Sequence, residues 1–214
     1  MYSIIITYNI GIEITNQKLL NDLLFELKKW QTKQKFKGNA QERPSIAATN
    51  YMILRSPLEF ETKLLPESKT GKRGSRKAML AKQKFEKYVT LWKLAQKAMH
   101  EIDPEFSETF TALAVTHNFV GSPHIDKQNI TPFYGLALGS FTNGEGGLRV
   151  EYDAKTVVEM NTKNRLGRID GRYPHWVAPW NNENGTLNRY SLIYYQTEGV
   201  TCEKGAAVPG VVIH

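Results

Sequence analysis

From residue 110 onward the chain is a succession of short β-rich segments, and this pattern constrains the fold more than any other feature. Turns rich in glycine and asparagine separate the segments, for example at residues 143–147 and 181–185. Many short strands at close spacing are typical of an antiparallel sandwich or barrel. We therefore expect an all-β C-terminal half. Its predicted strands are FTALAVTHNF, YGLALGSF, LRVEY, VVEM, RLGRIDG, HWVAPW and RYSLIYYQT.

The N-terminal half shows helical patterns instead. Apolar residues recur at spacings of three and four over residues 19–30, and Thr15 or Asn16 could cap the start of this helix. A second apolar stripe extends from Met79 to Met99. Strand-like runs occupy the N-terminus and residues 47–55. Both helical stripes predict packing against a sheet rather than binding of a partner.

The chain has 214 residues, enough for one domain with a substantial core. No linker or internal repeat divides the chain, so we predict a single domain over residues 1–214. A helical and mixed region (1–109) would support a β core (110–200), which makes the fold class α+β. We expect this domain to be a monomer.

The single cysteine, Cys202, can form neither an internal disulfide nor a cysteine zinc site, and we interpret it as incidental. No apolar run approaches the roughly 20 residues needed to span a bilayer. The N-terminal residues have no basic segment typical of a secretory signal. These features predict an intracellular protein, nuclear or cytoplasmic, without a membrane partner.

The formal net charge is +7 and the isoelectric point is about 9.3, which favours polyanionic partners. Basic residues concentrate between Lys69 and Lys77, where Gly71 and Gly74 predict a flexible loop. The sequence leaves two interpretations of this loop open. It is either a solvated loop or an arm that contacts phosphates. In the second case the candidate contacts are Lys72, Arg73 and Arg76.

A metal site is indicated by His124 and Asp126, which stand two positions apart in SPHIDKQN. On a strand, residues i and i+2 point to the same face, so the imidazole and the carboxylate could bind one metal ion. His175, at the start of a later strand-like run, is the candidate for the third ligand. Two histidines and one carboxylate form the facial triad of non-haem Fe(II) oxygenases, which leaves positions open for a co-substrate and dioxygen.

An anion site is indicated by Arg189 and Ser191, which also alternate onto one face of a predicted strand. A guanidinium can bind a carboxylate through two hydrogen bonds, and a hydroxyl can add a third. This pair suits the distal carboxylate of 2-oxoglutarate, whose keto-acid end would chelate the iron. Asn118 is a further candidate for cofactor binding.

The order His-X-Asp, distant His, Arg-X-Ser resembles the Fe(II)/2-oxoglutarate-dependent dioxygenases, whose fold is a double-stranded β-helix, or jelly-roll. More narrowly, residues 110–197 resemble the TET/JBP family, which oxidises the methyl group of 5-methylcytosine or thymine. The motifs that carry this narrower resemblance are PHIDKQN, LGSFTNGEGGLRVE, IDGRYPHWVAPW and RYSLIYYQT.

The resemblance implies a role for each matching residue. Iron would bind His124, Asp126 and His175, and the 2-oxoglutarate carboxylate would bind Arg189 with help from Ser191. Asn129 stands where the family has an asparagine that contacts the flipped base, and Tyr195 stands where a tyrosine stacks on that base. The chain departs from animal members at Thr197, where they have a histidine, and it lacks their cysteine-rich zinc extension.

The implied activity is oxidation of 5-methylcytosine in DNA to 5-hydroxymethylcytosine and further products. It would use Fe(II), 2-oxoglutarate and dioxygen, and RNA is a second possible nucleic-acid substrate. Two alternatives stay open at this point. The protein could be a 2-oxoglutarate-dependent hydroxylase of a protein side chain or a small metabolite, or it could be a non-catalytic nucleic-acid-binding module.

Overall fold

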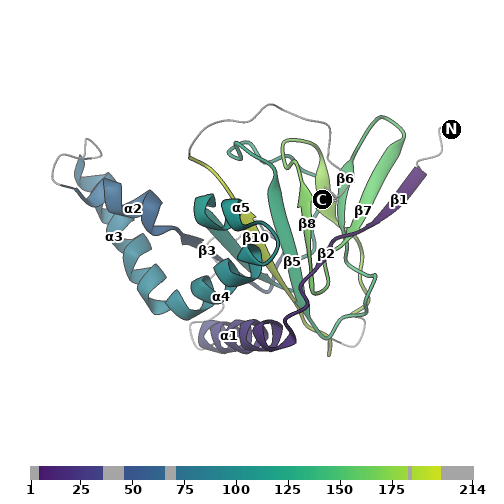
Figure 1. Ribbon diagram of the computed structural model, residues 1–214, viewed down its shortest axis with the longest axis horizontal. Coiled ribbons are helices and arrows are strands. Elements are labelled where there is room, and N and C mark those ends of the chain that lie inside the picture. The colour runs from purple at the N-terminus through teal and green to yellow at the C-terminus, as the bar shows by residue number, and fades with distance from the viewer. Residues whose placement is uncertain (1–4, 36–45, 66–70, 183–184, 199–214) are drawn as a thin grey trace.

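The computed structural model describes residues 5–35, 46–65, 71–182 and 185–198, and within these ranges the strands form two facing sheets (Figure 1). The smaller sheet has the order β1-β7-β6-β9. The larger sheet has the order β2-β8-β5-β10-β4-β3. The strands of the smaller sheet are β1 (Ile5–Ile10), β6 (Leu148–Glu151), β7 (Thr156–Asn161) and β9 (His175–Val177). Those of the larger sheet are β2 (Ile12–Glu13), β3 (Asn50–Arg55), β4 (Ala112–His117), β5 (Phe133–Gly139), β8 (Arg165–Ile169) and β10 (Arg189–Tyr195).

The path of the chain from β4 to β10 is that of a double-stranded β-helix. The chain starts in the larger sheet at β4, crosses to the smaller sheet at His124, and returns at β5. It then forms β6 and β7 in the smaller sheet, β8 in the larger, β9 in the smaller and β10 in the larger. This exchange between two sheets, in which β4 to β10 pair antiparallel, is the jelly-roll arrangement. The predicted fold class, an α+β chain around a jelly-roll core, is therefore confirmed.

The N-terminal region contributes to both sheets as well as supplying helices. β1 pairs in parallel with β7, β2 pairs with β8, and β3 pairs with β4 at the opposite edge of the larger sheet. The helices are α1 (Gln17–Lys35), α2 (Pro57–Leu64), α3 (Gly71–Lys87), α4 (Val89–His100) and α5 (Pro104–Thr109). None of these described helices is long and apolar enough to cross a membrane.

The main hydrophobic core lies between α1, α4 and the helix-facing side of the larger sheet. It contains Trp30 and Leu23 of α1, Trp92 of α4, and Leu192 and Tyr194 of β10. Asn16 caps α1 by accepting a hydrogen bond from the backbone N–H of Leu19, so the predicted cap is found at Asn16 rather than Thr15. A smaller core between the two sheets contains Phe133, Leu148, Val150, Val158, Met160 and Ile169.

The second helical stripe is divided, contrary to the sequence prediction of one continuous stripe. α3 ends at Lys87 and α4 begins at Val89, while Tyr88 between them has a non-helical backbone. Met79, expected in the stripe, is 48% exposed. Phe85, also expected in the stripe, does pack against the core, and Ala78 takes the buried place next to Met79.

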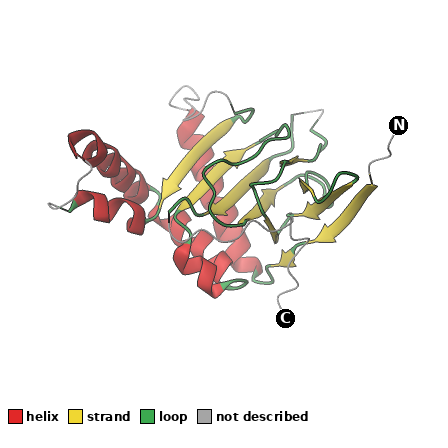
Figure 2. Cartoon of the chain, turned by 90° about the horizontal axis from the view of Figure 1, so that it is seen from above, coloured by secondary structure: helices red, strands yellow, loops and turns green. Residues whose placement is uncertain are grey.

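The predicted loop at Lys69–Lys77 is also wrong for the residues that the structure describes. Residues 71–77 form the first two turns of α3, and residues 69 and 70 lie outside the described part of the chain. The two glycines suggested a loop because glycine is a poor helix former. Packing of α3 against α2 and β3 overrides this local preference. Figure 2 shows the α2–α3 pair projecting at the end of the molecule opposite β1.

Candidate active site

Three potential metal ligands converge at the end of the smaller sheet. His124 and His175 form an antiparallel β-bridge in which each backbone N–H donates to the carbonyl of the other residue, at 3.1 and 2.9 Å. Their rings are therefore neighbours, with centroids 4.4 Å apart. The backbone N–H of Asp126 donates to the carbonyl of Gly171 at 2.7 Å, which brings the carboxylate to the two imidazoles.

The separations suit one metal ion. The Nε2 atoms of His124 and His175 lie 3.9 and 3.7 Å from the two carboxylate oxygens of Asp126. Two ligand atoms that each lie about 2.1 Å from one metal can be up to about 4.2 Å apart. The three residues form the one cluster of potential metal ligands found among the described residues.

Backbone carbonyls orient both imidazoles for metal binding. The Nδ1 atom of His124 lies 2.8 Å from the carbonyl of Ser122, and that of His175 lies 3.0 Å from the carbonyl of Tyr173. A carbonyl can only accept a hydrogen bond, so each Nδ1 carries the proton and each Nε2 is left with a lone pair for a metal. Burial lowers the pKa of His175, which keeps its imidazole in the neutral form that binds metals.

The geometric argument from the sequence is only partly right at this site. Strand periodicity predicted that His124 and Asp126 would point to one face of a regular strand. In the structure His124 forms an isolated bridge and Asp126 lies in an irregular segment. The two side chains meet because Gly171 holds the backbone at Asp126, a contact between distant parts of the chain.

Arg189 lies in the same cavity as the triad and carries a buried charge without a carboxylate partner. The residue is 2% exposed, and the structure contains no salt bridge between it and any carboxylate in the described ranges. Its guanidinium donates to the Ser191 hydroxyl and to the carbonyl of Gly146, the latter at 2.7 Å. The Nε atom has no partner among the described residues. Burial lowers the pKa of Arg189 to about 10.

A buried guanidinium without a carboxylate partner favours the binding of an anion. Leaving a buried charge without its counter-charge costs about 3–5 kcal/mol. The glycine at 146 makes room for the guanidinium, since a Cβ there would lie 2.8 Å from the Nε of Arg189. The residues therefore fit the carboxylate of a bound acid, and the triad fits Fe(II).

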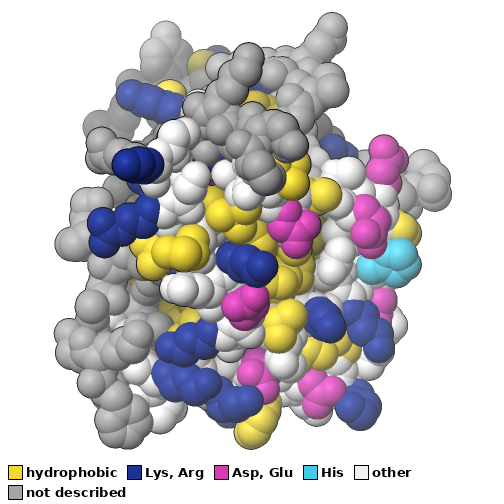
Figure 3. All heavy atoms as spheres, turned by 90° about the vertical axis from the view of Figure 1, so that its left-hand side faces the viewer, with side chains coloured by type: hydrophobic (Ala, Val, Ile, Leu, Met, Phe, Trp, Pro, Cys, Tyr) yellow, Lys and Arg dark blue, Asp and Glu magenta, His cyan; other side chains and the backbone are white. Residues whose placement is uncertain are grey.

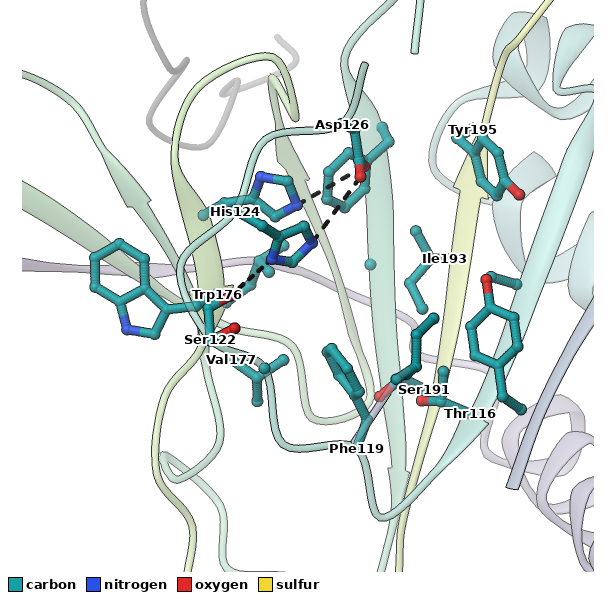
Figure 4. A pocket seen from close by; sticks show the side chains of 18 of the residues that line it. Thr116, Phe119, Ser122, His124, Asp126, Trp176, Val177, Ser191, Ile193 and Tyr195 are labelled. Carbon is teal, nitrogen blue, oxygen red and sulfur yellow. Dashed lines mark hydrogen bonds and ion pairs between the residues drawn. The ribbon is translucent and has the colours of Figure 1, made fainter. Parts of the chain in front are cut away.

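The cavity that joins these two features has a volume of about 580 Å³, within the usual range for small-molecule sites. In Figure 4 His124 and Asp126 lie at one wall, while Ser191, Ile193 and Tyr195 project from β10 at the other. Tyr195 is half-buried there. Its apolar walls include Tyr51, Phe119, Phe133, Val177 and Ile193.

Asn129 lines the cavity, but one side of its amide is already engaged. Its Nδ2 donates to the Oδ2 of Asp126 at 2.9 Å, and the residue is 7% exposed. Asn129 therefore positions the carboxylate of a candidate metal ligand. No hydrogen bond from a described residue reaches its Oδ1.

Other predicted site residues lie outside the cavity. Asn118 does not line it, and its Oδ1 accepts the backbone N–H of Arg189 at 2.9 Å, so it supports the arginine from behind. Thr197 donates its backbone N–H to the hydroxyl of Thr111, also away from the cavity. The three basic candidates, Lys72, Arg73 and Arg76, are on α3.

Some cavity residues escaped the sequence prediction. Ile193 continues the alternation from Arg189 through Ser191 to Tyr195, so strand periodicity could have found it. Tyr51 and Thr116 reach the cavity only because β3 and β4 pair beside β10. Gly146 was predicted only as part of a turn. No local signal relates it to Arg189, 43 residues later.

No protein-family model matches the chain, and no curated protein matches it significantly. Among the solved structures that are similar to it, three have 10–15% sequence identity. NgTET1 in complex with 5mC DNA has a TM-score of 0.46 over 90% of this chain and 72% of that one. A Trichoplax adhaerens prolyl hydroxylase, in complex with a hypoxia inducible factor peptide, has a TM-score of 0.47 over 87% and 81% at 14% identity. A Pseudomonas putida prolyl-4-hydroxylase has a TM-score of 0.40 over 86% and 88%.

Replacement of a triad residue should strongly weaken metal binding. We expect His124→Ala and Asp126→Ala to weaken Mn(II) or anaerobic Fe(II) binding by more than about 100-fold, since loss of a supporting contact alone costs 10–100-fold. Calorimetric titration would measure the affinity. His100→Ala, at an exposed histidine on α4, is the matched control and should bind like the wild type. Equal affinities of His124→Ala and the control would contradict the assignment.

Proposed function

We propose that the protein is an Fe(II)/2-oxoglutarate-dependent dioxygenase that oxidises the methyl group of a modified base, with 5-methylcytosine in DNA as the first candidate. The observation that carries this proposal is one cavity containing both a His-Asp-His triad and a buried arginine without a carboxylate partner. A metal site alone would suit many activities. Because the buried arginine also requires a carboxylate, the cavity suits a keto acid that binds the metal at one end and Arg189 at the other.

Each part of the cavity has a separate role in the proposed reaction. His124, Asp126 and His175 would hold Fe(II), and Arg189 would hold the distal carboxylate of 2-oxoglutarate. When bound, Fe(II) and 2-oxoglutarate together with dioxygen would supply the oxidation of a methyl C–H bond. The apolar walls formed by Phe119, Val177 and other residues exclude water from the reacting methyl group.

The amide of Asn129 offers an acceptor that suits the amino group of cytosine. Its Nδ2 donates one of its two hydrogens to the carboxylate of Asp126, and its carbonyl oxygen Oδ1 is available to accept a hydrogen bond from a ligand. The exocyclic amino group of cytosine donates a hydrogen bond, whereas the corresponding oxygen of thymine accepts one. Tyr195 at the cavity wall offers an aromatic face on which an extruded base can stack.

Basic residues on α3 are candidates for contacts with the nucleic-acid backbone. The exposed side chains of Lys72, Arg76, Lys77 and Lys82 form no salt bridge with carboxylates of the described residues. By contrast, Lys18 and Lys29 of α1 pair with acidic residues of the same helix. Figure 3 looks onto this end of the molecule, where basic side chains are spread among acidic and apolar ones. We also propose that the protein acts as an intracellular monomer.

The contact between Gly146 and the guanidinium of Arg189 provides a sensitive test of co-substrate binding. Gly146→Ala would place a Cβ 2.8 Å from the guanidinium, whereas Gly144→Ala would meet nothing within 4 Å. Both glycines have positive φ angles, so both variants share the backbone cost of about 1–2 kcal/mol. We expect only Gly146→Ala to lose about tenfold or more in 2-oxoglutarate affinity, measured by anaerobic titration of the Fe(II) charge-transfer band. Equal losses in both variants would contradict the proposed arginine site.

The proposed substrate is tested by turnover. We expect duplex oligonucleotides with 5-methylcytosine to gain one oxygen and to produce equimolar succinate, detected by mass spectrometry. Oligonucleotides with unmodified cytosine have no methyl group at C5 and should not react. Thymine should react at least about tenfold more slowly, because a mispaired polar group costs about 1–3 kcal/mol. His124→Ala protein is the inactive control. Turnover only with peptides or metabolites would favour the alternative hydroxylase, and DNA binding without succinate would favour a non-catalytic module.

The role of α3 is tested by charge reversal. We expect Lys72→Glu/Arg76→Glu to weaken DNA binding and to reduce the slope of log affinity against log salt by about 2, which corresponds to two lost phosphate contacts. Fluorescence anisotropy at several salt concentrations would measure both quantities. Lys93→Glu/Lys97→Glu on α4 has the same spacing and the same charge change, and should behave like the wild type. Equal effects of the two pairs would show that only net charge matters.

A further inference from the structure

A buried hydroxyl in the cavity makes no hydrogen bond with the described part of the protein. Thr116 on β4 is 2% exposed and lines the cavity, and its Oγ1 has no hydrogen-bond partner among the described residues. Buried polar groups in native proteins nearly always have a partner. A valine at this position would have the same shape without an unpaired hydroxyl. The threonine therefore indicates a ligand atom that the hydroxyl meets when the cavity is filled.

Strand register places this hydroxyl beside the arginine site. Thr116 is the direct partner of Ser191 in the antiparallel pairing of β4 with β10. Directly opposed side chains share one face of the sheet, with Cβ atoms about 4.5–5.5 Å apart. Ser191 in turn lies two residues from Arg189, on the same face of β10. Figure 4 shows Thr116 and Ser191 side by side on the cavity wall.

The hydrogen-bond directions make this group a set of donors. The Ser191 hydroxyl accepts a hydrogen bond from the guanidinium of Arg189, which leaves its own proton to be donated elsewhere. The proton of Thr116 is likewise unused. A guanidinium and two hydroxyl protons match a carboxylate, which only accepts and has about four lone-pair sites.

We propose that Thr116 is a further co-substrate-binding residue, whose hydroxyl donates a hydrogen bond to the distal carboxylate of the dicarboxylic keto acid held by Arg189 and Ser191. This inference rests on the proposed function. Thr116 thereby contributes to selectivity for a keto acid with a second carboxylate over one without it.

The test compares two keto acids on two variants. Fe(II)-loaded protein is titrated anaerobically with 2-oxoglutarate and with pyruvate, which has the chelating end but no distal carboxylate. We expect Thr116→Val to raise the dissociation constant for 2-oxoglutarate by about tenfold and to leave that for pyruvate unchanged, since a hydrogen bond to a charged group is lost. Thr116→Ser keeps the hydroxyl and should stay within about twofold of the wild type.

Thermal unfolding separates this role from a structural one. Thr116→Val should unfold at the same temperature as the wild type or a higher one, because it removes an unpaired buried hydroxyl. Unchanged 2-oxoglutarate affinity in Thr116→Val, or an equal loss for both keto acids, would overturn the inference while leaving the proposed function standing. If the wild type binds neither keto acid, the proposed function fails and the inference fails with it.

Discussion

The two-residue repeat of β10 is the constraint on which both the core and the site depend. One set of its side chains, Tyr190, Leu192 and Tyr194, packs into the helix-covered core. The other set, which includes Arg189 and Ser191, faces the cavity between the sheets. β10 lies between β4 and β5, so its position is held by hydrogen bonds on both sides. A shift of one residue in its pairing would place the arginine in the apolar core and remove it from the cavity.

Electrostatics at the site are organised around charges that the described protein leaves uncompensated. Asp126 supplies one negative charge between two imidazoles, and Arg189 supplies one buried positive charge elsewhere in the cavity. Hydrogen bonds from outside the site orient these residues. The carbonyls of Ser122 and Tyr173 orient the two histidines, and Asn118 holds the backbone of Arg189. This arrangement suits the proposed binding of a dication at one end of the cavity and a carboxylate at the other.

Sequence reasoning worked best where chemistry and a short-range period coincide. The alternation in the segment after residue 189 correctly grouped Arg189, Ser191 and Tyr195 on one cavity wall. Prediction from the sequence was less accurate where backbone preference competes with packing. At residues 71–77 two glycines predicted a loop, whereas the structure has a helix. The pair His124 and Asp126 lies between these cases. The residues do meet, but in an irregular segment rather than on a regular strand.

The sequence by itself determined the types of side chain at the site and the succession of strands that carries them, because residue chemistry and two-residue periodicity are local properties. Only the tertiary structure decided which residues complete the site. Thr116 and Tyr51 reach the cavity through the pairing of β3, β4 and β10, and Gly146 reaches Arg189 through a contact across 43 positions. The physical reason is that sheet register and close packing are set by the whole core, so the sequence of a single segment does not specify which residues lie next to it in space.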